Sequence, residues 1–207
     1  MKILHLVSSP REESSMSIKL GNAIIEKLKT VNPESSLTVR NLAKSAFPHL
    51  EEVHLSSFFT PAENHTPELV EAVKHSDEAI AELKNADVIV IGVPMYNFGI
   101  PSNLKAWIDH IARAGKTFTY TAKGPEGLLK NKKVYLAISS GGVYSPEPMK
   151  AYDFTESYLR ALLGFLGITD ITAFRVEGLG MPDLKEHAMN KALQNIEDEF
   201  TGLGNAA

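Results

Sequence analysis

The chain has 207 residues, of which 43% are hydrophobic and 22% are charged, a composition typical of a soluble globular protein. Its formal net charge of −4 provides no basic footprint, which argues against nucleic acid as the main partner. Cysteine is absent, which excludes disulfides, thiolate catalysis and cysteine-bound metal clusters, and we expect a cytoplasmic protein. No segment approaches the roughly 20 apolar residues that span a bilayer, so no membrane is expected as a partner.

Strand-like and helix-like segments alternate from one end of the chain to the other. Short apolar or alternating runs predict five strands, at residues 3–7, 37–40, 88–93, 134–138 and 169–176. Helical spacing of apolar residues predicts helices at residues 18–28, 66–83, 101–111, 153–167 and 182–200. Residues 43–65 show neither pattern and are expected to be irregular.

Two of the helix starts carry recognisable caps. Thr66 is expected to be an N-cap, with Pro67 at the first helical position. Asp153 and Glu156 have the spacing of a capping box at the start of the fourth helix.

The alternation of strands and helices predicts an α/β fold with a parallel sheet covered by helices on both faces. The second and fifth strands alternate apolar and polar residues, which is typical of edge strands, whereas the other three are mainly apolar. These features favour the strand order 2-1-3-4-5 of the flavodoxin-like arrangement. No repeat or linker divides the chain, so we expect one domain spanning residues 1–207.

Ligands of such sheets bind beyond the carboxyl ends of the strands, where the strand order reverses. Three loops converge there, at residues 8–17, 94–99 and 139–144. The first loop runs into a helix whose free N–H groups suit a phosphate, and Ser9, Ser15 and Ser17 add hydroxyl donors. The alternative is that Ser14 or Ser15 only caps this helix.

The other two loops suit a flat heteroaromatic ring. Met95, Tyr96, Asn97 and Phe98 offer a thioether, two aromatic rings and an amide for a ring with a polar edge. The Gly141–Gly142 pair lets backbone N–H groups approach a ligand closely. The structural alternatives are an ordinary strand-to-helix turn and a flexible glycine turn. The three loops together favour a flavin.

Other candidate sites are weak. The seven histidines show no metal-binding spacing, and His5 is interpreted as a core residue whose hydrogen bonds are satisfied. Ser139 and Ser140 lack the Gly-x-Ser-x-Gly nucleophile elbow, which argues against a serine hydrolase.

Over nearly its whole length the chain resembles the FMN-dependent NADH azoreductases and quinone reductases of the flavodoxin-like superfamily. The motifs that carry the resemblance are Pro94-Met-Tyr-Asn-Phe98, Ala112-Arg-Ala-Gly115, Gly124-Pro-Glu-Gly127, Gly141-Gly142 and Gly164-Phe-Leu-Gly-Ile-Thr-Asp170. The resemblance implies FMN at Ser9, Ser15, Met16, Ser17, Pro94, Met95, Tyr96, Asn97, Phe98, Ser139, Ser140, Gly141, Gly142 and Tyr144. It also implies a homodimer with active sites at the subunit interface, in which residues 43–65 and Phe118 to Tyr120 supply walls above the flavin. Tyr144, Phe118 and Tyr120 are expected to stack on the second substrate.

The chain departs from the usual family pattern at two positions. Met16 and Ser140 stand where many relatives have glutamine and arginine in the first and third loops. Backbone contacts are expected to survive both changes, whereas the flavin potential or the nicotinamide preference can change.

The expected reaction transfers two electrons from NADH or NADPH through flavin N5 to quinones and azo compounds, by a ping-pong mechanism. The cofactor carries the chemistry, so no catalytic side chain and no metal are expected. The alternatives are an electron-transfer carrier of the flavodoxin type and a hydrolase of phosphoesters or thioesters.

Overall fold

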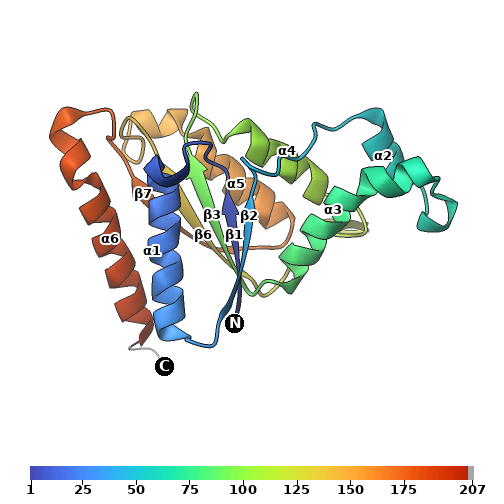
Figure 1. The fold of residues 1–207 in the computed structure, drawn as a ribbon, viewed down its shortest axis with the longest axis horizontal. Helices are drawn as coiled ribbons and strands as arrows, with labels where there is room; N and C mark the ends of the chain where they lie inside the picture. Colours follow the sequence, from blue (N-terminus) through green and yellow to red (C-terminus); the bar gives the residue numbers. More distant parts are fainter. Residues whose placement is uncertain (205–207) are drawn as a thin grey trace.

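Five parallel strands form the central sheet, in the spatial order β2-β1-β3-β6-β7 (Figure 1). They are β1 (Lys2–Val7), β2 (Ser36–Asn41), β3 (Val88–Pro94), β6 (Lys133–Ser139) and β7 (Asp170–Val176). This confirms the predicted sheet and its 2-1-3-4-5 order, since β4 and β5 belong to a separate hairpin. The computed structural model describes residues 1–204, and the side chains up to residue 201.

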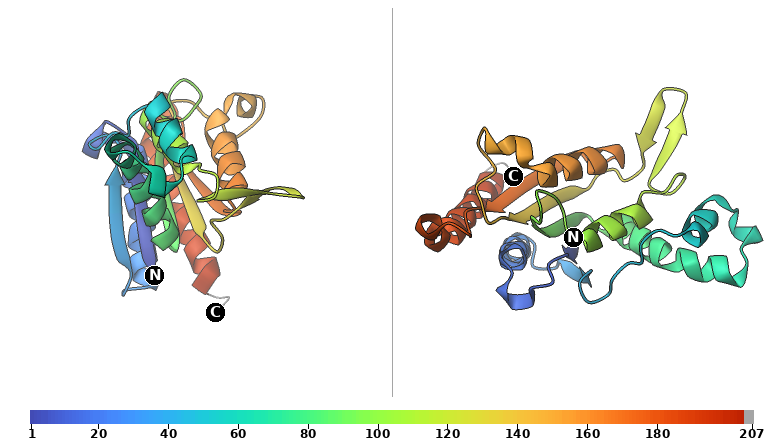
Figure 2. Two further views of the ribbon diagram at one scale, coloured as in Figure 1. Left: turned by 90° about the vertical axis from the view of Figure 1, so that its right-hand side faces the viewer. Right: turned by 90° about the horizontal axis from the view of Figure 1, so that it is seen from above.

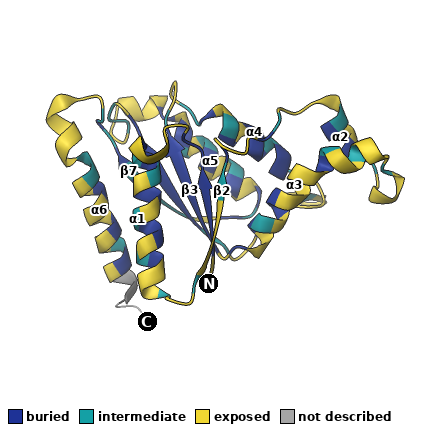
Figure 3. Ribbon diagram, viewed as in Figure 1, coloured by how far each residue is buried: buried dark blue, intermediate teal, exposed yellow. Residues whose placement is uncertain are grey.

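Helices cover both faces of the sheet. One face carries α1 (Met16–Val31) and α6 (Pro182–Gly204), and the other carries α3 (Pro67–Asn85), α4 (Ser102–Ile111) and α5 (Phe154–Phe165) (Figure 1). Two apolar cores result, because alternate residues of each strand point to opposite faces. Strand β3 is buried along its whole length, whereas the edge strand β2 is largely exposed (Figure 3). Within residues 1–204, no helix combines the length and the hydropathy that a bilayer crossing needs.

The two predicted caps have different outcomes. The hydroxyl of Thr66 accepts a hydrogen bond from the backbone N–H of Leu69, with Pro67 at the first position of α3, as predicted. Asp153 caps α5 by accepting from Thr155 and Glu156 backbone N–H groups. The capping-box prediction is wrong in its second half, because the Glu156 carboxylate bonds to arginines instead.

The expectation that residues 43–65 are irregular is wrong for part of the stretch, which contains α2 (Glu52–Phe59). A capping box of Glu51 and His54 starts this helix. The guanidinium of Arg113 lies 4.6 Å from the ring centroid of Phe58. Contacts of this kind with the rest of the protein stabilise α2. Because they involve residues distant in the chain, they leave no periodic pattern in the sequence of α2 itself. Three single 3₁₀ turns, at η1 (Glu12–Ser14), η2 (Ala62–Asn64) and η3 (Met149–Tyr152), complete the loops.

An antiparallel hairpin of β4 (Phe118–Thr121) and β5 (Gly124–Gly127) projects from the body of the protein (Figure 2). Its base lies backbone to backbone against the turn that follows α5. A Cβ placed on Gly127 would lie 2.1 Å from the backbone nitrogen of Gly167, so only glycine fits there. Just beyond β5, the N–H of Leu129 donates to the carbonyl of Leu166 at 2.9 Å. Main-chain contacts and the packing of the Phe118 ring on the Phe165 ring therefore hold the base of the hairpin.

Candidate functional site

A cavity of about 290 Å³ opens beyond the carboxyl ends of β1, β3, β6 and β7. The loops after these four strands supply its lining: Ser9, Arg11, Ser14, Ser15, Met16, Pro94, Met95, Tyr96, Ser139, Ser140, Gly141, Leu179 and Gly180. The cavity therefore lies at the predicted switch point of the sheet. It brings together parts of all three loops that the sequence singled out.

The first loop leads into α1 without a side-chain cap. Ser15 occupies the N-cap position but makes no capping hydrogen bond, and the hydroxyl of Ser14 donates to the carbonyl of Arg11. The structure thus removes the alternative that either serine only caps α1. Instead, the hydroxyls of Ser15 and Ser17 lie 3.0 Å apart, both side chains being buried.

The N-terminus of α1 has the properties of an anion site. Its first-turn N–H groups point out of the helix, and no side chain in residues 1–201 caps them. Ser9 is buried beside them and lines the cavity together with Ser15. The exposed Arg11 is the charged residue of the lining. This combination of helix dipole, hydroxyls and one cation fits a phosphate group.

The second loop is a tight turn with a strained backbone. Tyr96 and Gly99 exchange two backbone hydrogen bonds of 3.0 Å, and between them Asn97 and Phe98 have φ values of 49° and 68°. Positive φ at both central residues defines a type I′ turn, which Asn tolerates but a bulky Phe adopts only at a cost. Strain of this kind is concentrated at functional sites, where the surrounding structure maintains it.

The turn determines which side chains reach the cavity. Pro94, Met95 and Tyr96 line it, whereas Asn97 and Phe98 lie outside the lining and are exposed. The ring of Phe98 lies 6.1 Å from that of Tyr144 and 5.7 Å from that of Tyr152, measured between centroids. An aromatic cluster therefore stands beside the cavity, on the side of the second loop.

The third loop presents main chain to the cavity. Ser139, Ser140 and Gly141 line it, and a Cβ on Gly141 would meet no atom of the described residues within 4 Å, so this backbone faces open space. The hydroxyl of Ser140 donates to the carbonyl of Gly142 at 2.8 Å and so faces its own loop. Gly142 and Tyr144 are outside the lining. The predicted close approach of backbone to a ligand is thus possible at Gly141.

A fourth loop, after β7, was not predicted as part of the site. The N–H groups of Gly178, Leu179 and Gly180 donate to the carbonyls of residues 142, 140 and 141, at 3.0, 3.2 and 2.8 Å. These bonds join the fourth loop to the third and bring Leu179 and Gly180 into the cavity wall. The sequence did contain a signal, because β7 is parallel to the other strands and its carboxyl end lies at the same edge.

The remaining predicted residues lie apart from the cavity lining. Ser17 is buried in the first turn of α1, with its hydroxyl next to that of Ser15. Phe118 packs on Phe165 at the base of the hairpin, with ring centroids 4.6 Å apart, and Tyr120 is 72% exposed on the same strand. Within the described chain, Phe118 and Tyr120 are therefore not part of the cavity lining.

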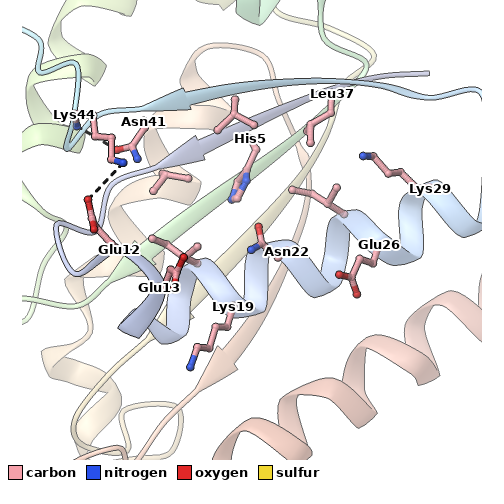
Figure 4. A pocket seen from close by; sticks show the side chains of 14 residues that line it. His5, Glu12, Glu13, Lys19, Asn22, Glu26, Lys29, Leu37, Asn41 and Lys44 are labelled. Carbon is pink, nitrogen blue, oxygen red and sulfur yellow. Dashed lines mark hydrogen bonds and ion pairs between the residues drawn. The ribbon is translucent and has the colours of Figure 1, made fainter.

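A second hollow, of about 660 Å³, lies between α1 and β2 (Figure 4). His5 points into the space between the two elements, and Glu12 and Lys44 form an ion pair of 3.4 Å at one end. The interpretation of His5 as a satisfied core residue is wrong in one respect. Its side chain is buried, but Nε2 has no hydrogen-bond partner in the described part of the chain. Burial lowers the pKa of His5 to about 4, so the ring is neutral at pH 7.

Comparison with known proteins identifies the family. The family model described as "Flavodoxin-like fold" matches residues 1–200. An FMN-dependent NADH:quinone oxidoreductase of Herminiimonas arsenicoxydans is 50% identical over 202 residues, covering 98% of each chain. One of Aromatoleum aromaticum is 47% identical, covering 95% of this chain and 98% of its own.

Solved structures agree with this relationship. The azoreductase of Bacillus anthracis strain Sterne is 30% identical and superimposes with a TM-score of 0.89, covering 97% of this chain and 98% of its own. An FMN-dependent NADH-azoreductase from the Ames Ancestor strain, in complex with FMN, is 28% identical, with a TM-score of 0.88, 98% coverage of this chain and 99% of its own. The chain therefore belongs to the flavodoxin-like fold family, in the group that includes the FMN-dependent NADH:quinone oxidoreductases.

Proposed function

We propose that this chain is an FMN-dependent oxidoreductase that takes two electrons from NADH or NADPH and passes them to quinones and azo compounds. The observation that carries the proposal is the uncapped N-terminus of α1, with its three buried serines, at the switch point of the sheet. This site fits the phosphate of FMN. The strained Tyr96–Gly99 turn and the bare backbone at Gly141 are next to it and fit a flat ring with a polar edge. The whole chain would then act as one FMN-binding domain.

Each loop has a distinct task in this proposal. The first-turn N–H groups of α1, which include that of Ser17, hold the phosphate together with the hydroxyls of Ser9 and Ser15, and Arg11 adds a positive charge. The backbone at Gly141 donates to the polar edge of the ring, and Met95 and Tyr96 lie against its other parts. Bound FMN supplies hydride acceptance at N5 and the delivery of two electrons. The protein contributes binding, orientation and exclusion of water.

The aromatic cluster next to the cavity suits a flat second substrate. The rings of Tyr144 and Phe98, which pack edge to face, lie beside the proposed flavin position. Donor and acceptor would use this slot in turn, which is the structural basis of a ping-pong mechanism. A slot of this kind binds flat aromatic molecules by their shape, so quinones and azo compounds are both accommodated.

We also propose that the protein is a homodimer whose second subunit completes the slot. Large aromatic side chains are exposed both around the cavity and on the projecting elements, notably Phe59 (79%), Tyr120 (72%) and Phe154 (58%). Aromatic side chains are enriched in protein interfaces, so these exposed rings are available for contact with a second subunit. Sedimentation equilibrium should give twice the 22.7 kDa mass of the chain, and a monomer at micromolar concentration would contradict the proposal.

Titration with FMN and with riboflavin, followed by anaerobic mixing with NADH, tests the function. FMN should bind more tightly than riboflavin because only FMN carries the phosphate. The FMN-loaded protein should then lose its visible flavin absorbance on mixing with NADH alone, and regain it on addition of a quinone. A protein that binds no FMN would overturn the proposal. One that binds FMN and is reduced by dithionite but not by NADH or NADPH would be a carrier of the flavodoxin type.

A further inference from the structure

Glu177 fixes the far end of the third loop with a single carboxylate. Its Oε1 accepts hydrogen bonds from the backbone N–H groups of Tyr144 and Ser145, at 2.8 and 2.9 Å. Its Oε2 accepts from the hydroxyl of Ser145 at 2.5 Å. Glu177 is the first residue after β7, so the end of the strand anchors the third loop. Three hydrogen bonds to a carboxylate restrain the loop strongly.

Arg175, two residues earlier on β7, connects Glu177 to α5. Its Nη1 lies 3.4 Å from Glu177 Oε1, its Nη2 lies 2.5 Å from Glu156 Oε2, and Nη2 also pairs with Asp153. The Arg175 side chain is only 15% exposed, so water screens these interactions weakly. One guanidinium thus binds three carboxylates, two at the start of α5 and one at the end of β7.

The connection continues from α5 to the second loop. Asp153, which Arg175 holds, caps α5. Next to it, the backbone N–H of Phe154 donates to the carbonyl of Phe98 at 3.0 Å. Phe98 is one of the two residues with positive φ in the strained turn. A continuous path therefore runs from Tyr144 through Glu177, Arg175 and Asp153 to Phe98.

The path closes on itself, because the rings of Phe98 and Tyr144 also meet directly in an edge-on contact. None of the three charged residues in the path lines the proposed flavin cavity. They act on the cavity only through the two loops that they hold.

We propose that Arg175 and Glu177 are positioning residues of the flavin site, which set the third loop against the second so that its backbone N–H groups meet the ring. This inference rests on the proposed function, since it concerns the same site. The two residues contact neither the cofactor nor the substrate. Their contribution is the geometry of the ring-binding groups, which determines both FMN affinity and how well the reduced, more electron-rich flavin is stabilised.

A pair of variants at position 177 separates geometry from charge. E177Q removes the negative charge but keeps an oxygen that accepts from the loop, so it should bind FMN close to wild type. E177A removes every acceptor and should weaken FMN binding about tenfold or more, the factor expected for loss of hydrogen bonds to a charged group. Both variants lose the same charge, so a difference between their flavin reduction potentials reports loop position. The potential of E177A should be the more negative.

R175K provides a second, independent variant that keeps the positive charge. A lysine has no planar guanidinium and cannot bond to all three carboxylates at once, so the connection between Glu177 and Asp153 should be lost. Hydrogen exchange of the FMN-loaded protein should then accelerate together at the amides of Tyr144, Ser145 and Phe154. D170A serves as the matched control. Asp170 lies at the other end of β7 from Arg175, and its substitution breaks an ion pair of 2.6 Å with Lys133 of β6. D170A should alter neither FMN affinity nor the flavin potential.

The outcomes distinguish this inference from the proposed function. If wild type fails to bind FMN, the proposed function fails first. If wild type binds FMN but E177A and E177Q share its affinity and potential, Arg175 and Glu177 are merely structural and the inference is wrong. If E177A does not fold, equal amide exchange in R175K and wild type would overturn the inference. Coordinated exchange and a potential that separates E177A from E177Q would support it.

Discussion

The imidazole of His5 fills the space that a side chain at position 21 of α1 would need. A Cβ built on Gly21 would lie 2.8 Å from His5 Nε2 and 3.4 Å from Cε1. The glycine therefore allows α1 to lie directly over β1 at this point, and the histidine loses access to a partner for Nε2. Two residues of opposite size thus set the distance between the helix and the sheet.

Gly21→Ala should lower the free energy of unfolding by about 1 kcal/mol. Alanine gains up to about 1 kcal/mol of helix propensity, but overpacking a core typically costs about 1–3 kcal/mol. The matched control is Gly164→Ala in α5, where a Cβ meets no atom within 4 Å among the residues that the structure describes, and a gain in stability is expected. Urea unfolding of both variants measures the effect. An equal gain at the two sites would mean that the His5 ring moves aside freely.

The buried His5 should make stability depend on pH. Its pKa in the folded protein is lowered to about 4 by burial, whereas an exposed histidine titrates near 6.5. Between these values the unfolded chain binds a proton that the folded chain does not, so stability falls as pH drops from about 6.5 to 4. The loss should reach about 2–3 kcal/mol. Urea unfolding of wild type and H5Q at pH 7.5, 6 and 4.5 measures it, and parallel pH curves for the two proteins would refute the assignment.

Ser15 and Ser17 should contribute to FMN affinity through the phosphate. The double variant S15A/S17A removes two hydroxyls next to the first-turn N–H groups, and should weaken FMN binding about tenfold. Riboflavin, which lacks the phosphate, provides the internal control and should bind the variant as it binds wild type. Fluorescence quenching of both ligands measures the difference. Equal weakening of FMN and riboflavin would show that the serines support the fold of the loop instead.

The strain at Phe98 should be measurable by comparing two truncations. Phe98→Gly and Phe98→Ala both remove the ring, but only glycine adopts a φ near 68° without steric cost. F98G should therefore be more stable than F98A by about 1 kcal/mol in urea unfolding. If the two variants unfold at the same concentration of urea, the turn relaxes to negative φ once the ring is removed.

The sheet could be predicted because its three central strands are continuous apolar runs and its edges alternate. The same reasoning missed β4 and β5, each four residues long, since Pro125 and two glycines at the ends of β5 disguise a strand. It also missed α2, which depends on contacts such as Arg113 with Phe58 and not on an amphipathic pattern of its own.

The site was predictable to the extent that chain order determines which loops meet. Strand order placed Ser15, Met95 and Gly141 at one edge of the sheet, and the structure brings them together in one cavity. The roles of Leu179 and Gly180 depend on backbone hydrogen bonds between two loops, which no side-chain pattern records. The φ values of the second loop, which turn Asn97 and Phe98 away from the cavity lining, are likewise a property of the folded turn.

The direction of the β4–β5 hairpin is determined at its base, and the residues at its tip do not affect it. The base of the hairpin is held by the main-chain contact of Gly127 with Gly167, by the backbone hydrogen bond between Leu129 and Leu166, and by the packing of Phe118 on Phe165, none of which involves residues 119–126. Substitutions between Thr119 and Glu126 can therefore accumulate during evolution while the arm still points the same way. Related proteins are thus free to differ in the residues at the tip of the hairpin, and so in the molecules that the tip contacts, while the rest of the fold stays the same.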